Sequence, residues 1–251
     1  MLEPKAELGA AGREGDGAGS TDLKRTLATA CRILSMEGYQ DMTLGHMSAR
    51  EPGSSTFWMK PSGFGLNEIS PEMLIRVDLD GKKLEGEGRR HIEVFIHSEI
   101  YRRRPDVNAV LHGHPVYATL FGSSDFSLRP LMHEGAYFAP HVPRFDLTSD
   151  LIMNPEQGRA VAEALGSYAA LFMRNHGVVV VGESAEEACL AAIFLEKAAQ
   201  TQLVAISAGP CSWATPEDTR AKQEHIYRNL QLMKDFWGYF CRKLSRLNPK
   251  I

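Results

Sequence analysis

The sequence has no long apolar run and no large excess of charge of either sign. No window approaches the roughly 18 to 20 uninterrupted apolar residues that a membrane helix needs, and the N-terminus lacks the basic start and apolar core of a secretory signal. Lys and Arg total 28 against 31 Asp and Glu, so the net charge of −3 gives no general positive field for nucleic acid or an anionic membrane. We therefore expect a cytoplasmic protein that binds neither a membrane nor nucleic acid.

Cysteine is scarce, and its spacing suits no structural role. The four cysteines are Cys31, Cys189, Cys211 and Cys241, and no CxxC pair occurs among them. Such spacing argues against both a zinc knuckle and a disulfide scaffold. We expect reduced, partly buried thiols.

Internal repeats and linkers are also missing. No repeat of fixed period occurs, and no Pro/Ser-rich stretch divides the chain after residue 21. The 251 residues, 43% hydrophobic and 24% charged, suffice for one large domain with a substantial core. Residues 1–20 hold five glycines among alanines and charges, a composition that cannot bury enough apolar surface to fold. We predict a flexible tail over 1–20 and a single domain over 21–251.

Helices and short apolar strands alternate along the predicted domain. Asn154, Ser184 and Thr215 are N-cap residues, each of which can accept a hydrogen bond from a backbone N–H three residues on. With apolar periodicity they predict the following elements. Helices are expected over 20–38, 92–104, 115–121, 155–166, 184–207 and 216–244, and strands over 56–59, 74–78, 108–111, 171–174 and 178–181. Strands that are apolar on both sides favour an α/β fold with helices on both faces of a sheet.

The segment Asn108–Pro115, with the sequence NAVLHGHP, carries the clearest chemical signal. Side chains two apart on a strand point to the same side, so His112 and His114 can present two imidazoles to one metal ion. His176, in the tetrapeptide RNHG between two apolar strands, is the best candidate for a third ligand. The alternative for His176 is a core histidine that is hydrogen-bonded to a backbone carbonyl.

Glu93 lies at the start of the helix expected over 92–104, with His97 one turn later on the same face. By itself this is a carboxylate favoured by the helix dipole, or an i,i+4 pair with His97. Beside an ion that is held by three neutral imidazoles, it can instead act as a general base or as a displaceable fourth ligand. The combination predicts a lyase-type site.

Several segments match, in order, the motifs of one protein family. They are Gly45–Arg50 and Lys60–Gly63, which resemble two glycine-containing loops of that family, and Glu93, Arg104–Pro115 and Asn175–Gly177. Together, and with 19 positions separating Glu93 from His112, they resemble the class II aldolase/adducin family over roughly residues 22 to 240.

The resemblance implies a three-layer αβα sandwich around a central mixed, mainly antiparallel sheet. It implies one divalent ion per subunit on His112, His114 and His176. Zn²⁺ is the expected ion, while Fe²⁺, Mn²⁺ and Co²⁺ stay open because imidazole is a borderline ligand. It also implies a homotetramer with active sites between subunits. In family aldolases the acid that matches Glu93 helps remove a proton, while the ion polarises the carbonyl and stabilises an enediolate.

The chain departs from the sugar-phosphate aldolases of the family where they bind phosphate. Those enzymes use a Gly-Asn loop and a Ser-Ser pair just before the catalytic Glu, because hydroxyls and N–H groups solvate a dianion. This chain has Gly45-His46 and His91-Ile92 there. We therefore expect a small non-phosphorylated substrate, either a hydroxy-carbonyl compound or a 2-oxo acid. The expected substrate-binding residues are His46, Ser62, Gly63 and His133.

Two of these histidines have structural alternatives, and the residue that protonates the product is open. His46 could equally make a loop-stabilising hydrogen bond, and His133 could be a buried histidine. Glu134 aligns with the tyrosine that protonates the product in fuculose-phosphate aldolases, so the acid is one of Glu134, Tyr137 and His133. The loop-like stretch 135–138 is expected to line the same cleft.

The leading hypothesis is a divalent-metal-dependent lyase of the aldolase or decarboxylase type. The alternative is a non-haem Fe(II)/O2-dependent oxygenase that shortens an aromatic 2-oxo acid, as some members without the phosphate-binding residues do with prenylated hydroxyphenylpyruvate. A non-catalytic scaffold that resembles the adducin head is disfavoured, because this chain carries Glu93 and all three histidines.

Overall fold

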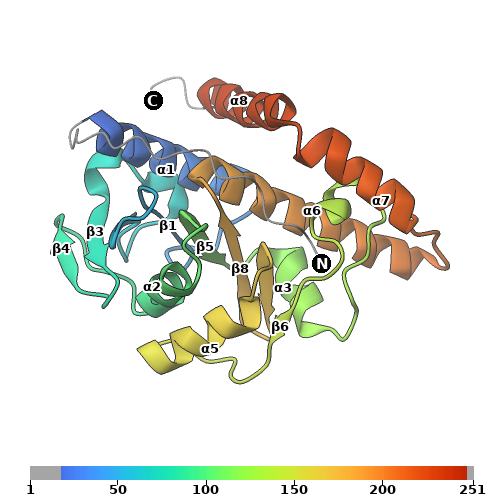
Figure 1. The fold of residues 1–251 in the computed structure, drawn as a ribbon, viewed down its shortest axis with the longest axis horizontal. Helices are drawn as coiled ribbons and strands as arrows, with labels where there is room; N and C mark the ends of the chain where they lie inside the picture. Colours follow the sequence, from blue (N-terminus) through green and yellow to red (C-terminus); the bar gives the residue numbers. More distant parts are fainter. Residues whose placement is uncertain (1–17, 248–251) are drawn as a thin grey trace.

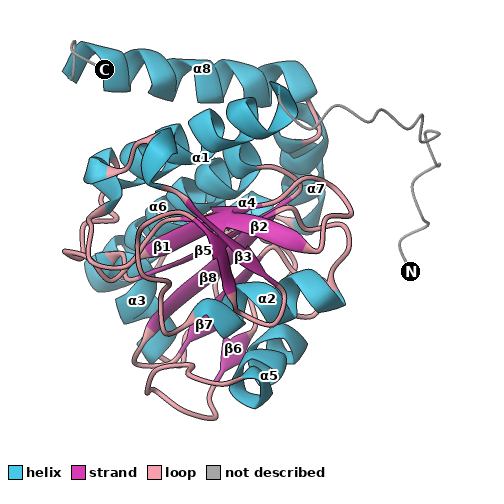
Figure 2. Ribbon diagram, turned by 90° about the vertical axis from the view of Figure 1, so that its left-hand side faces the viewer, coloured by secondary structure: helices cyan, strands magenta, loops and turns pink. Residues whose placement is uncertain are grey.

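One eight-stranded sheet runs through the centre of the molecule, between layers of helices (Figure 2). The computed structural model describes residues 18–247. The strands are β1 (His46–Ala49), β2 (Thr56–Met59), β3 (Ile75–Asp78), β4 (Lys83–Glu85), β5 (Ala109–Gly113), β6 (Arg144–Phe145), β7 (Ala170–Met173) and β8 (Gly177–Gly182). Their order is β4-β3-β2-β1-β5-β8-β7-β6, and every pair is antiparallel except β6 with β7. The predicted mixed, mainly antiparallel sheet is confirmed.

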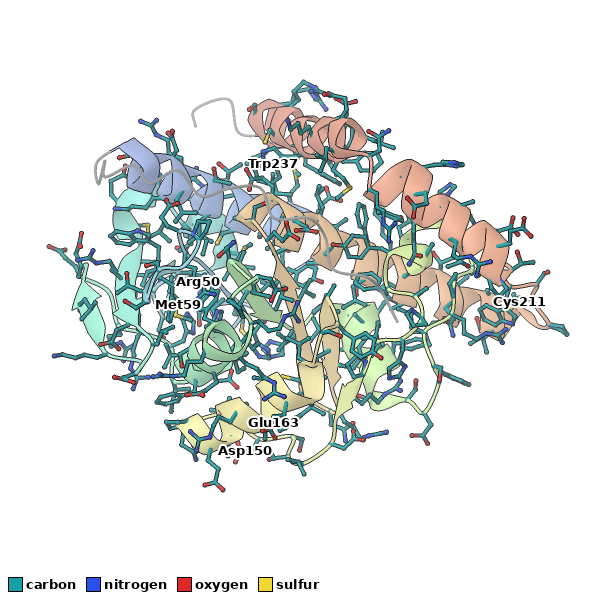
Figure 3. All side chains as sticks on the ribbon, in the orientation of Figure 1. Arg50, Met59, Asp150, Glu163, Cys211 and Trp237 are labelled. Atoms are coloured by element: carbon teal, nitrogen blue, oxygen red, sulfur yellow. The ribbon has the colours of Figure 1, made fainter. Side chains whose placement is uncertain are left out.

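Helices cover both faces of the sheet, and the predicted three-layer arrangement is confirmed (Figure 1). The helices are α1 (Ala18–Met36), α2 (Val94–Arg103), α3 (Val116–Ser123), α4 (His133–Tyr137), α5 (Pro155–Leu165), α6 (Ala185–Ala208), α7 (Pro216–Lys222) and α8 (Leu230–Leu247). One face of the sheet packs on α2 and α5, and the other on α1, α3 and α6. α8 lies outside α1 and α6, where Trp237 packs against the core (Figure 3).

The two-residue repeat of the central strands decides which side chains meet which helices. On β1, Met47 and Ala49 join the core on the α1 and α6 side. His46 and Ser48 alternate with them and therefore point toward α2. The same alternation on β5 sends Leu111 to the α6 side. The central strands β1, β5 and β8 thus present apolar side chains to α1 and α6 and a mixture of apolar and polar side chains to α2.

α6 is apolar because it is a core helix. Within residues 18–247 it is the one helix long and apolar enough to cross a membrane by length and composition. It packs against α1, α3 and β8, and 12 of its 24 residues are buried. Burial inside the protein therefore accounts for its composition. All four cysteines are free, as expected, and Cys31 and Cys189 are buried.

Four local predictions were wrong. The stretch Gly45–Arg50, expected as a loop, contains the central strand β1, all of whose residues are buried. The loop-like stretch 135–138 lies largely in the short helix α4. The helix expected over 216–244 is interrupted between α7 and α8 by a π-helical turn over Gln223–Tyr227. The first helix begins at Ala18, inside the predicted tail, whose remaining residues 1–17 lie outside the described part of the chain.

Gly158 lets α5 approach α2 closely, which predicts a stability effect. A Cβ at this position would lie 2.4 Å from the Phe95 carbonyl oxygen and 3.0 Å from Glu99 Cγ. Gly158→Ala must therefore push the helices apart, and we expect a loss of about 1–3 kcal/mol in the free energy of unfolding, measured in urea.

The matched control is Gly238→Ala in α8, where the new Cβ meets only the mobile end of Arg242 at 3.2 Å. This change should be neutral, or should stabilise by about 1 kcal/mol through helix propensity. Equal effects at the two glycines would contradict the packing argument.

Candidate metal and catalytic site

Six of the nine histidines form one cluster at one end of the sheet, together with Glu93. The six are His46, His91, His97, His112, His114 and His176. Glu93 contacts three of them, His46, His112 and His176. Antiparallel pairing places His46 at the start of β1 opposite His112 near the end of β5. His176 lies in the tight turn from β7 to β8, so its strand ends at the same edge. The predicted metal ligands and Glu93 therefore come together in the structure.

The turn that carries His176 explains its Asn-His-Gly sequence. Asn175 adopts a left-handed conformation, with φ of 55°, that asparagine tolerates better than most residues. At Gly177 a Cβ would lie 2.5 Å from His114 Cδ2 and 2.6 Å from the Gly113 carbonyl oxygen. Glycine is therefore required for His114 to pack directly over this turn, beside His176.

His112, His114 and His176 have the arrangement of a three-histidine metal site. Each offers a ring nitrogen within 4.8 Å of the others. The Nδ1 of His112 donates to the Val178 carbonyl oxygen at 3.1 Å, which leaves the lone pair on Nε2. The Nδ1 of His114 lies 2.5 Å from Asp41 Oδ2, so its Nε2 is free in the same way. His112 Nε2 is buried and has no hydrogen-bond partner, as a metal-ligating nitrogen would before an ion binds.

Burial keeps two of these imidazoles neutral. Loss of solvation, followed by the nearby His114, lowers the pKa of His112 well below its usual value. The same two causes lower the pKa of His176 to about 4. Neutral imidazole is the form that binds a metal, so both rings are ready to act as ligands at neutral pH.

Glu93 lies close to ring nitrogens of two of the three histidines, His112 and His176. Its Oε2 is 3.5 Å from His112 Nε2, and its Oε1 is 3.4 Å from His176 Nε2. Oε1 also accepts a hydrogen bond from the Ile152 N–H at 3.0 Å, which fixes the carboxylate. Burial raises the pKa of Glu93, and the Ile152 hydrogen bond opposes this only in part. A fixed carboxylate with a raised pKa is suited to accept a proton and give it back.

A second possible set of metal ligands consists of His46, Glu93 and His112, because one potential ligand atom of each lies within 4.8 Å of the others. The Nε2 of His46 is 3.7 Å from Glu93 Oε2, and its Nδ1 is 2.7 Å from His97 Nε2. His46 therefore faces the site from a rigid central strand, not from the loop that the sequence predicted.

Lys60, which contacts His91, adds a positive charge near His46. Lys60 is fully buried, and its Nζ contacts the Thr43 and Pro61 carbonyl oxygens and His91 Nε2, at 3.2, 3.4 and 3.3 Å. Burial lowers the pKa of Lys60 to about 8, and burial followed by Lys60 lowers the pKa of His91 to about 3. The His46 and His91 rings lie 4.3 Å apart. An anionic group in this corner would be attracted by the ammonium.

Ser62 and Gly63 line a neighbouring open pocket of about 740 Å³. The Ser62 N–H donates to the Arg89 carbonyl oxygen at 2.7 Å, and Gly63 has a φ of 91°. Pro61, which accepts from Lys60, also lines this pocket. Ser62 and Gly63, two of the predicted substrate-binding residues, therefore line a pocket that adjoins the buried cluster through Lys60 and Pro61.

The three candidate acids on α4 lie elsewhere in the subunit. The Tyr137 hydroxyl donates to Glu187 Oε1 at 3.2 Å, and burial, followed by Glu187, raises its pKa well above its usual value. Tyr137 lines a small pocket with Gly182, at the opposite end of β8 from His176. His133 is exposed on the first turn of α4. A single subunit does not bring His133, Glu134 or Tyr137 to the histidine cluster.

Sequence reasoning missed several residues of the cluster. Asp41, which holds His114, is separated from it by 73 positions, and no local pattern connects them. Ser48 contacts both His97 and Tyr101 in the protein interior. A signal for Tyr101 existed, because Glu93, His97 and Tyr101 recur every four residues on one face of α2.

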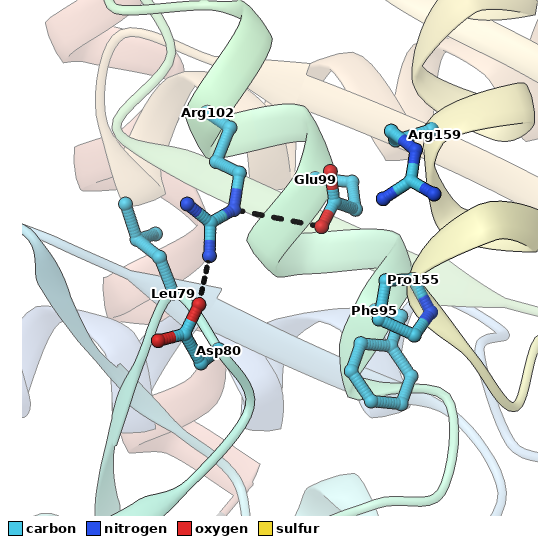
Figure 4. Close-up of a pocket in the computed structure, with 7 residues that line it drawn as sticks. All are labelled: Leu79, Asp80, Phe95, Glu99, Arg102, Pro155 and Arg159. Atoms are coloured by element: carbon cyan, nitrogen blue, oxygen red, sulfur yellow. Dashed lines mark hydrogen bonds and ion pairs between the residues drawn. The ribbon is translucent and has the colours of Figure 1, made fainter.

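The other face of α2 carries a separate hollow of about 370 Å³ next to α5 (Figure 4). There Arg102 pairs with Glu99, at 3.5 Å, and with Asp80. This hollow is lined by neighbouring turns of α2 but faces away from Glu93, and it contains none of the cluster histidines.

Comparisons with known proteins agree with the fold. The model of the Class II Aldolase and Adducin N-terminal domain matches residues 25–203. The chain is 36% identical over 191 residues to Decarboxylase NovR of Streptomyces niveus, covering 74% of this chain and 71% of that protein. It is 35% identical over 233 residues to the 4-hydroxy-3-prenylphenylpyruvate oxygenase/4-hydroxy-3-prenylbenzoate synthase of Streptomyces roseochromogenus subsp. oscitans, covering 91% and 84%.

A solved structure, the L-fuculose 1-phosphate aldolase of Glaciozyma antarctica PI12, is also similar. It superposes with a TM-score of 0.83 at 25% identity, over 96% of both chains. The match to the family model, over residues 25–203, includes every strand and helix that carries a residue of the histidine cluster. The chain belongs to the class II aldolase/adducin family.

Proposed function

We propose that the chain is a divalent-metal-dependent lyase that acts on a small, non-phosphorylated hydroxy-carbonyl or 2-oxo-acid substrate. The observation that carries this proposal is the convergent group of three imidazoles with the buried Glu93 beside two of them. Membership of the class II aldolase/adducin family and the 36% identity to a decarboxylase support it.

His112, His114 and His176 are the proposed ligands of one ion per subunit. Their free ring nitrogens converge, and Val178 and Asp41 orient two of the rings through Nδ1. A bound divalent ion would act there as a Lewis acid on the substrate oxygens. Zn²⁺ is the proposed ion, and Fe²⁺, Mn²⁺ and Co²⁺ are the alternatives that imidazole ligands accept.

Glu93 is the proposed proton-transfer group. Oε1 is held by the Ile152 N–H, whereas Oε2 faces His46 and His112 and is free to meet substrate. In a decarboxylation of a carboxylate on the carbon next to the carbonyl, the C–C bond breaks, its electron pair stays with the product as an enolate, and CO2 leaves. Glu93, protonated at the start of the turnover, gives its proton to that carbon and afterwards takes another from water.

The polar groups around the cluster favour a substrate with one negative charge. Sugar-phosphate aldolases of the family surround a dianion with several hydroxyl and N–H donors, and here His91 and the half-exposed Ile92 precede Glu93. Lys60 supplies one buried positive charge, which suits a carboxylate. We place substrate between the cluster and the pocket of Ser62 and Gly63.

A homotetramer is the proposed assembly, with sites between subunits, and the cytoplasm is the proposed compartment. Large apolar side chains are exposed near the cluster, including Val116 and Leu120 on α3. In this assembly a neighbouring subunit would supply the acid, from Glu134 or His133. Tyr137 fits this role less well because its hydroxyl already bonds Glu187.

An Fe(II)- and O2-dependent oxygenase on an aromatic 2-oxo acid is the second candidate function. The relative named as such an oxygenase matches 91% of this chain, more than the decarboxylase does. Three histidines accept Fe²⁺ as readily as Zn²⁺. The two candidates therefore share the ligands and differ in the metal and the co-substrate.

Metal content and oxygen uptake separate the two functions. Protein purified without added metal is analysed for zinc and iron, and O2 consumption is followed with aromatic 2-oxo acids. Stoichiometric zinc with no oxygen uptake supports the lyase, and iron with substrate-dependent uptake supports the oxygenase. His112→Ala, the control, should lose metal and activity together. Wild-type protein that binds neither metal would contradict both.

Asp41→Asn tests how His114 is held. The change keeps the size of the side chain but removes the negative charge that accepts from His114 Nδ1. Loss of such a carboxylate partner typically weakens metal binding by about 10- to 100-fold. Zinc affinity, measured by competition with a chelator, should fall by that factor. Asp22→Asn, on the exposed side of α1, is the control and should leave affinity unchanged.

Glu93→Gln separates proton transfer from metal binding. Gln preserves an oxygen to accept from the Ile152 N–H but lacks the basic carboxylate. Metal content should persist while CO2 release falls by roughly 10² to 10⁴. In the oxygenase, the same change should instead uncouple O2 uptake from product formation. Near-normal turnover with full metal occupancy would show that Glu93 is only a helix-start carboxylate.

A further inference from the structure

A chain of buried hydrogen bonds leads from the catalytic site into the protein interior. His46 Nδ1 lies 2.7 Å from His97 Nε2, and His97 Nδ1 lies 2.7 Å from Ser48 Oγ. Ser48 Oγ in turn lies 2.8 Å from the Tyr101 hydroxyl. All four side chains are at most 2% exposed, so water is not available to replace a missing partner. The chain joins β1 to α2.

The Tyr101 hydroxyl determines which partner donates in each of these three hydrogen bonds. Within residues 18–247, Ser48 Oγ is the one group placed to accept a hydrogen bond from the Tyr101 hydroxyl, because its other partner, the Val110 backbone N–H, can only donate. A buried O–H group needs an acceptor, so Tyr101 donates to Ser48. The Ser48 proton must then go to His97 Nδ1, the remaining partner of Ser48.

The same reasoning fixes both histidine tautomers. Because His97 accepts at Nδ1, its proton is on Nε2 and is donated to His46 Nδ1. His46 therefore carries its own proton on Nε2, the nitrogen that faces Glu93. The opposite direction would leave the buried Tyr101 hydroxyl without an acceptor, which is unfavourable.

We propose that this series of hydrogen bonds locks His46 in the Nε2–H tautomer. In that tautomer His46 is a hydrogen-bond donor to substrate and cannot be a metal ligand. His46 Nε2 is buried and unpaired, and its 3.7 Å separation from Glu93 Oε2 is too long for a hydrogen bond. The proton is thus available to a substrate oxygen that gains negative charge. This inference rests on the proposed function, because it assigns a role within the same site.

The fixed tautomer of His46 also decides which of the two possible sets of metal ligands can hold an ion. His112 donates Nδ1–H to a carbonyl oxygen and so keeps a lone pair on Nε2. His46 accepts at Nδ1 from His97 and has no lone pair on Nε2. The group of His112, His114 and His176 can therefore hold an ion through neutral imidazoles, and the group of His46, Glu93 and His112 cannot. Ser48, His97 and Tyr101 are positioning residues, since they act through His46.

The tautomer is tested by NMR on zinc-loaded protein labelled with ¹⁵N in histidine. Long-range ¹H–¹⁵N correlations distinguish a protonated Nε2 from a protonated Nδ1 in each ring. Wild-type protein should show His46 as a single Nε2–H tautomer. Tyr101→Phe removes the hydroxyl that sets the direction, so His46 should become a mixture of both tautomers with zinc content unchanged.

The matched control is Tyr39→Phe. Tyr39 is as buried as Tyr101, but its hydroxyl donates to the Ala192 carbonyl oxygen, outside the chain. This variant should lose thermal stability much as Tyr101→Phe does and should keep the single His46 tautomer. A wild-type Nδ1–H tautomer, or an unchanged tautomer in Tyr101→Phe, would overturn the proposal.

Zinc stoichiometry separates failure of this inference from failure of the proposed function. His46→Ala should bind zinc as wild type does, whereas His112→Ala should not. Loss of zinc in His46→Ala alone would show that His46 is a ligand, and the lock would be wrong while the metal site stood. If wild-type protein bound no zinc, the proposed metal would be wrong, and the tautomer in metal-free protein would still test the lock.

Discussion

The antiparallel pairing of β1, β5 and β8 is the constraint on which the site depends. It puts His46 directly opposite His112 and brings the turn that carries His176 to the same edge of the sheet. A shift of one residue in β5 would turn His112 to the other face, into the apolar layer of α1 and α6. The apolar residues that alternate with the histidines therefore hold the chemistry in place, because they fix the register.

Burial shifts the pKa values of the histidines and of Glu93 in opposite directions, and both shifts favour the proposed chemistry. Desolvation lowers the pKa of His112 and His176, so these rings stay neutral and can bind an ion. It raises the pKa of Glu93, so this carboxylate holds a proton more readily than an exposed one. One physical cause thus prepares both the ligands and the base.

The sequence alone could predict the parts of the site that depend on local periodicity. Alternation along a strand predicted that His112 and His114 act together, and helical spacing connected Glu93 with His97. What it could not predict depends on long-range pairing. β1 has only four residues, two of them polar, and is a strand because β2 and β5 pair with it on either side. The contact of Asp41 with His114 has the same origin.

Two histidines of the cluster have different proposed roles, and the hydrogen-bond partner of each Nδ1 atom determines which role each one has. His112 meets a backbone carbonyl oxygen, which can only accept, so its Nε2 must offer a lone pair. His46 meets another imidazole, which can donate or accept, so its tautomer is decided three hydrogen bonds away at Tyr101. A ligand whose tautomer is set by the backbone tolerates side-chain changes nearby. A donor whose tautomer is set by a side-chain network does not, and this difference separates metal binding from substrate recognition in one cluster of histidines.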